Sequence, residues 1–122
     1  MHNNKDFNLY TRVVNYDEYL RINVATCIPN VQRDLRIHLL DESYNLLRSL
    51  YEAEYTKGNI RMKNITEMLV IISMLDFISA ELLEYCPNNK RKIIKSIEML
   101  TEIKNMTYSW RKNPEPDAKE NN

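Results

Sequence analysis

The sequence predicts an all-α protein that folds as an up-down-up-down four-helix bundle. The 122 residues include one glycine and four prolines, which leaves few positions for the tight turns of a β-sheet. Apolar residues recur every three to four positions over four long stretches, as on one side of a helix. Short breaks separate these stretches, and helices joined by short turns pack antiparallel. We therefore expect one bundle domain over residues 1–113.

The first two helices are predicted on either side of a proline break. Apolar residues at helical spacing place the first over residues 5–26, with Asn4 as its N-cap. Pro29 ends it, because the residue before a proline is disfavoured in the α region. The second helix is expected over residues 31–56, with Asn30 as its cap. Two adjacent apolar stripes make it wider on its apolar side than one helix contact needs.

The third helix, predicted over residues 60–86, organises the rest of the chain. Gly58 is expected to follow the end of the second helix as its C′ residue, and Asn59 to cap the third. Its core stripe is predicted at seven positions in steps of three and four: Ile65, Met68, Ile72, Leu75, Ser79, Leu82 and Cys86. Further apolar residues lie beside this stripe and behind it, so this helix is expected to have neighbours on nearly every side.

The fourth helix is predicted over residues 90–112, after the break at Cys86 and Pro87. Residues 114–122 place two prolines among charged residues, so a disordered charged tail is expected there. The apolar run in the third helix is much shorter than the roughly 20 residues that cross a bilayer. The start of the chain has no apolar leader segment. We expect no membrane partner and a cytoplasmic location.

The two cysteines have no metal-ligand spacing and are expected to be reduced, small buried side chains. Because the first and third helices run parallel in this topology, Cys27 and Cys86 should lie at the same end of the bundle. A bond or redox pair between them is the less favoured alternative.

Catalytic motifs are not found in the sequence. No Glu-x-x-His pair is present for a di-iron site, since His38 follows Leu35 by three residues and His2 precedes the first helix. One glycine does not suffice for a phosphate-binding loop. The prediction is therefore a protein that is not an enzyme, with no catalytic residue, no metal and no cofactor.

The distribution of charge suggests a binding surface. Lysine plus arginine equals aspartate plus glutamate, 17 each, but cations open the helices, where the helix dipole disfavours them. In the antiparallel topology one end of the bundle collects seven cations, Arg21, Arg33, Arg36, Lys90, Arg91, Lys92 and Lys95, against Asp34, Glu81 and Glu84. A basic end of this kind suits phosphate groups or an acidic partner. The alternative is a solvated surface of mixed charge.

The order of these elements resembles a known family. A first helix with Leu-Tyr, a proline before a long helix that ends in Glu-Ala-Glu-Tyr (residues 52–55), an apolar helix and a last helix that closes in Trp-Arg-Lys (residues 110–112) are similar to the Avd-like four-helix bundle proteins. These are accessory variability determinants of diversity-generating retroelements, related in fold to 23S rRNA intervening-sequence proteins. The resemblance covers roughly residues 7–113.

The resemblance implies a homo-oligomeric, pentameric barrel that binds the element's reverse transcriptase and its template RNA or an RNA/DNA hybrid. Such a protein supports mutagenic retrohoming and is not itself a catalyst. The residues expected to bind RNA or polymerase are Arg33, Arg36, Lys90, Arg91, Lys92 and Lys95. Members of this family are basic, whereas this chain is neutral. The alternative function is an oligomeric interaction module of the intervening-sequence type that does not bind nucleic acid.

Overall fold

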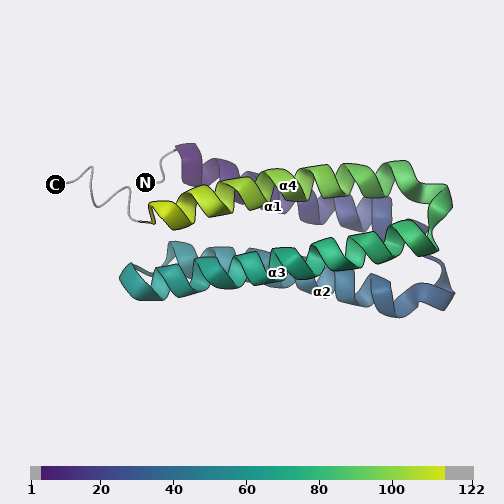
Figure 1. Cartoon of the computed structure of the whole chain (residues 1–122), viewed down its shortest axis with the longest axis horizontal. Coiled ribbons are helices and arrows are strands. Elements are labelled where there is room, and N and C mark those ends of the chain that lie inside the picture. Colours follow the sequence, from purple (N-terminus) through teal and green to yellow (C-terminus); the bar gives the residue numbers. More distant parts are fainter. Residues whose placement is uncertain (1–3, 115–122) are drawn as a thin grey trace.

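The computed structural model describes residues 4–114 and confirms the all-α four-helix bundle (Figure 1). The four long helices are α1 (Asn4–Tyr19), α2 (Arg33–Glu54), α3 (Gly58–Tyr85) and α4 (Lys90–Lys112). Each helix runs antiparallel to the next, and α1 contacts both α2 and α4. The predicted disordered tail begins at residue 114, and its residues 115–122 lie outside the described part of the chain.

The first predicted helix is not α-helical over its whole length. After α1 ends at Tyr19, the chain forms a π-helical turn over Leu20–Val24 and a 3₁₀ turn over Ala25–Cys27. The amide of Ala25 donates to the carbonyl of Leu20, five residues back, which defines the wider π turn. Leu20, Val24 and Ala25 are all buried, so the altered winding keeps successive apolar residues against the core.

The predicted asparagine caps of α2 and α3 were wrong. Asn30 opens a 3₁₀ turn over Asn30–Gln32, and α2 begins only at Arg33 without a side-chain cap. Asn59 lies inside α3, whose N-cap position is Lys57. Gly58 is the first residue of α3, not the residue after α2, and has a positive φ of 61°. A glycine adopts this left-handed conformation without the steric cost that a side chain brings. The turn therefore depends on backbone conformation at Gly58.

The core follows the stripe predicted on α3. All seven predicted positions are buried. Five of them pack with apolar residues from α1, α2 and α4 into one cluster: Met68, Ile72, Leu75, Leu82 and Cys86. The expectation that α3 has neighbours on nearly every side holds only in part within one chain. Ile71 and Ile78 are buried, but Val70, Met74 and Phe77 are exposed. One side of the central helix is thus apolar and uncovered.

Tyr16 is the largest polar side chain at the centre of this core. Its hydroxyl is fully buried and has no hydrogen-bond partner among the described residues. Burial raises the pKa of Tyr16 well above its ordinary value of 10.0, and the carboxylates of Asp76 and Asp17 add to the shift. The folded protein therefore holds this phenol in its neutral form, while the unfolded chain can ionise it above pH 10.

Replacing Tyr16 with phenylalanine is expected to stabilise the protein by about 1 kcal/mol at pH 7, because it removes a buried hydroxyl that has no partner. Above pH 10, ionisation of this phenol stabilises the unfolded state of the wild type. The difference in free energy of unfolding between Tyr16→Phe and the wild type should therefore grow by about 1 kcal/mol per pH unit. Urea unfolding of both proteins at pH 7 and pH 11 measures this difference, and a smaller difference at pH 11 would contradict a phenol that stays neutral in the folded protein.

Candidate nucleic-acid interface

The end of the bundle at the right of Figure 1 brings together the residues predicted to bind RNA. There α2 and α4 begin, and the α1 and α3 segments end. Two proline breaks shape it: Ile28 is extended before Pro29, and Pro87 opens a 3₁₀ turn before α4. Asn89 joins the two breaks, because its backbone amide donates to Cys86 O at 3.0 Å and its side chain donates to Cys27 O at 3.4 Å.

Three of the six predicted cations are exposed and make no contact that fixes them. Arg33 is the first residue of α2, and Lys90 and Arg91 open α4. The first turn of α4 holds no acidic residue, and no side chain caps its amides. Cations there oppose the helix dipole by about 0.3–1 kcal/mol each. A bound anion would relieve this cost, so these positions favour a negatively charged partner.

Lys92, in the first turn of α4, and Lys95, one turn further along, lie next to the end of α1. Tyr19 Oη donates to the carbonyl of Lys92 at 3.0 Å, and Lys95 Nζ lies 5.6 Å from the centre of the Tyr19 ring. Lys92 Nζ also lies 3.6 Å from Cys27 Sγ. Both lysine side chains remain exposed. They can reach a phosphate while their backbone is anchored to α1.

Arg36 differs from the other five predicted residues. Its side chain is half-buried, and Nη1 donates to the carbonyl of Ile28 at 3.3 Å. Arg36 therefore holds the connection between the first two helices as well as adding charge to this end. Arg21, which the sequence also placed here, binds Asp17 at 2.9 Å. Of the six predicted residues, none forms an ion pair with another residue in the described chain.

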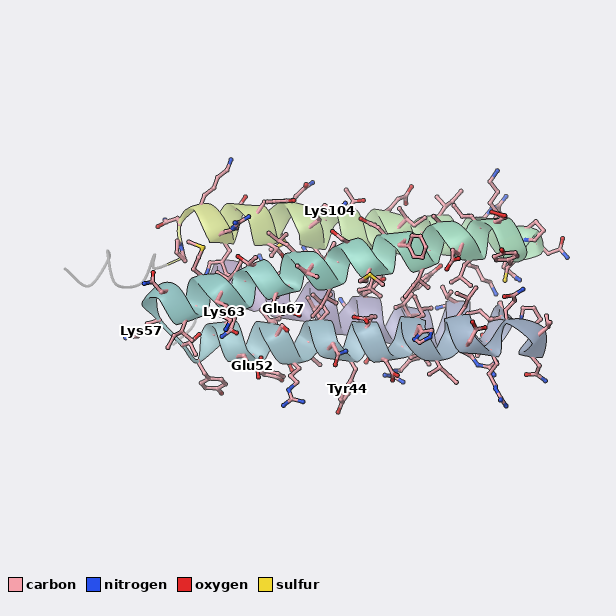
Figure 2. All side chains as sticks on the ribbon, turned by 60° about the horizontal axis from the view of Figure 1, so that its bottom comes forward. Tyr44, Glu52, Lys57, Lys63, Glu67 and Lys104 are labelled. Atoms are coloured by element: carbon pink, nitrogen blue, oxygen red, sulfur yellow. The ribbon has the colours of Figure 1, made fainter. Side chains whose placement is uncertain are left out.

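The structure shows that charge is segregated along the bundle. The middle carries three cations, Arg12, Arg48 and Lys104, against eight acids, Asp17, Glu18, Asp41, Glu42, Glu67, Asp76, Glu98 and Glu102. Among the side chains that the structure describes, the opposite end carries five cations, Lys57, Arg61, Lys63, Arg111 and Lys112, against Glu52 and Glu54. Figure 2 shows Glu52, Lys57 and Lys63 at that end. The described part of the chain thus has an excess of cations at both ends and an excess of acids in the middle.

The second basic end was not predicted from the sequence. One of its cations, Arg61, forms hydrogen bonds within the fold. Arg61 donates from Nε to Ala53 O at 2.9 Å and from Nη1 to Pro114 O at 2.7 Å. Its guanidinium also lies 5.7 Å from the centre of the Trp110 ring. Arg61 therefore ties the ends of α2 and α4 to α3.

Two exposed apolar stripes complete the candidate surfaces. The α3 stripe consists of Val70, Met74 and Phe77, and Phe77 is 59% exposed. The α2 stripe consists of the exposed Ile37, Tyr44 and Tyr51, with the partly buried Leu40 and Leu47 beside them. Tyr44 is 65% exposed and points outward (Figure 2). Tyr51 Oη donates to Tyr10 Oη at 2.9 Å, which places the α2 stripe on the side facing α1. The two stripes therefore lie on separate faces.

The two stripes overlap in height along the bundle. The helices α2 and α3 leave the short turn between them antiparallel, and each rises by about 1.5 Å per residue. The α3 stripe, residues 70–77, therefore lies beside the part of α2 that carries the other stripe, residues 37–51. Arg33 and Glu81 lie beyond these stripes toward the end at which α2 begins, and Arg48 and Glu67 lie further toward the turn.

Metal and membrane sites find no support in the described chain. No group of three or more histidine, cysteine, aspartate or glutamate side chains between residues 4 and 114 could hold a metal ion. Within the same range no helix is long and apolar enough to cross a membrane. Comparison with protein-family models, curated proteins and solved structures found no match to this chain.

Proposed function

We propose that this protein is a non-enzymatic accessory factor of a diversity-generating retroelement. It binds the reverse transcriptase and the template RNA through the basic end at which α2 and α4 begin. The observation that carries this proposal is the set of six cations gathered there, none of which is neutralised by an ion pair in the described chain. Five of the six, all except Arg36, are exposed. Exposed, unpaired cations near helix starts are suited to phosphate oxygens.

The apolar stripes support a homo-oligomer as the form that carries this end. Because they overlap in height on separate faces, the α2 stripe of one copy can dock on the α3 stripe of the next. The facing charges are then opposite, with Arg33 near Glu81 and Arg48 near Glu67. Such head-to-tail contacts close into a ring when the rotation that relates one copy to the next divides a full circle evenly. A ring, five-membered in the proteins that the chain resembles, would place the basic ends on one rim.

The second candidate function is an oligomeric interaction module that does not bind nucleic acid. The acidic middle and the zero net charge favour it, because they weaken the long-range attraction of a polyanion. This module would form the same ring, and its basic end would remain a solvated surface. The two candidates differ only in whether RNA and polymerase bind.

A reconstitution tests the proposed function. The protein is mixed with a reverse transcriptase and a template RNA from a diversity-generating retroelement, and the mass of the complex and the yield of cDNA are measured. The proposal predicts a complex that contains all three components and more cDNA than the polymerase makes alone. Equal cDNA yield with and without the protein, and no shared complex, would favour the interaction module.

A further inference from the structure

Two thiols and an ammonium group meet at the basic end of the bundle. Cys27 closes the 3₁₀ turn that follows the π-helical turn, and its side chain is half-buried. Cys86 directly follows α3 and is only 5% exposed. The two residues are far apart in sequence, but Asn89 donates hydrogen bonds to the carbonyls of both. The turns that carry the two thiols are therefore joined.

The sulfur of Cys27 has two polar partners. It donates to Asn23 O at 3.3 Å, and Lys92 Nζ lies 3.6 Å away. The two cysteine residues are related through Asn89, which lies within hydrogen-bond distance of both of their carbonyls. Burial raises the pKa of the Cys86 thiol, and the charge of Cys27 adds to the shift.

We propose that Cys27 and Cys86 form a redox-modification site, in which a small hydroperoxide oxidises the pair to an intramolecular disulfide. Cys27 is the attacking thiol, because it is half-exposed and the Lys92 ammonium lies 3.6 Å from its sulfur, where it can stabilise the charge that moves during the attack. Cys86 is the resolving thiol, because it is covered and Asn89 ties its turn to that of Cys27. This site does not depend on the proposed RNA-binding function, and the two proposals are tested by separate experiments.

The reaction has two steps. The Cys27 thiolate attacks one oxygen of the hydroperoxide, the O–O bond breaks, and the leaving oxygen takes up a proton to give an alcohol or water. Cys27 is then a sulfenic acid. The sulfur of Cys86 attacks the sulfenic sulfur, the S–O bond breaks, and water leaves with the thiol proton. The two thiols are oxidised by two electrons, and the hydroperoxide is reduced by two.

The disulfide would add a covalent link between two segments that at this end are joined by the hydrogen bonds of Asn89. Cys27 ends the α1 segment and Cys86 follows α3, and these two helices run parallel. The bond would withdraw the Cys27 sulfur from Lys92 and Asn23, which are its present partners. Oxidation therefore acts directly beneath the exposed lysines of α4.

The test is to treat the reduced, full-length protein with hydrogen peroxide and to follow free thiols, intact mass and non-reduced peptides. Both thiols should disappear together, the mass should fall by about 2 Da, and Cys27 and Cys86 peptides should be linked until a dithiol reductant is added. Cys86→Ser should stop at a sulfenic acid on Cys27 that dimedone traps. Lys92→Met should slow the first step several-fold, while Lys95→Met, a matched change at the same end, should not.

Three outcomes would overturn this site. The first is independent oxidation of the two cysteines, seen as added oxygen without a linked peptide. The second is a disulfide between chains in place of one within the chain. The third is a Cys27→Ser variant in which Cys86 reacts with peroxide as fast as Cys27 does in the wild type. RNA affinity is not a readout in any of these measurements.

Discussion

Reversing the three cations that open α4 is expected to reduce RNA affinity by roughly a hundredfold or more at moderate salt, because each lost phosphate contact forfeits counterion release. The variant carries Lys90→Glu, Arg91→Glu and Lys92→Glu. All three side chains are exposed, and none forms an ion pair in the described chain. Acids are favoured at a helix start by about 0.3–1 kcal/mol each, so the bundle should stay folded and its melting temperature should not fall.

Fluorescence anisotropy with a labelled, unstructured RNA measures this effect. The matched control reverses three exposed cations at the opposite end, Lys57, Lys63 and Lys112, to glutamate. Both variants have the same net charge, so a difference between them reports position. We expect the control to retain most of the wild-type affinity. An equal loss in both variants would show that total charge, and not the end at which α2 and α4 begin, determines binding.

Phe77→Asp is expected to dissociate the protein into 14.6 kDa protomers. Phe77 is 59% exposed within one chain, so an aspartate there is tolerated by the fold. In the proposed ring it lies against the α2 stripe of the next copy, where burying an unpaired carboxylate would cost several kcal/mol. Light scattering at moderate salt measures the mass. Tyr108→Asp is the matched control, because Tyr108 is 48% exposed on α4 and belongs to neither stripe.

The facing charges allow a sharper test of the same interface. Arg48→Glu should weaken the assembly, because it places two acids against each other near Glu67, and adding Glu67→Arg should restore it. Arg48 also contacts Glu52 at 3.7 Å, but both side chains are exposed and this pair contributes little. A wild type that is already a monomer, or a double variant that stays as weak as Arg48→Glu, would contradict the proposed docking of the two stripes.

The helices were predictable because their signals are local. A single glycine, proline breaks and apolar periodicity set the four helices, and the fourth was predicted at its observed bounds, residues 90–112. The π-helical turn after α1 was not predictable, since it arises from the fit of Leu20, Val24 and Ala25 to the core. The role of Gly58 was misassigned, because a C′ glycine and a glycine that opens the next helix look alike in sequence.

The candidate site was predictable in location but not in detail. Charges near helix ends and an antiparallel topology suffice to bring Arg33, Lys90 and Arg91 together. The half-burial of Arg36 depends on the path of the turn at Ile28, which periodicity does not define. The overlap in height of the apolar stripes depends on how α2 and α3 pack against each other. Sequence spacing identifies such stripes on each helix but does not relate one helix to another.

The decisive measurement is the affinity of the wild-type protein for single-stranded RNA at a series of salt concentrations. If the basic end binds phosphates, the logarithm of the affinity should fall linearly with the logarithm of the salt concentration. Three to five phosphate contacts on single-stranded RNA correspond to a slope of about −2 to −3.5. No binding at low salt, or an affinity that does not change with salt, would contradict the proposed function and leave an interaction module that does not bind nucleic acid.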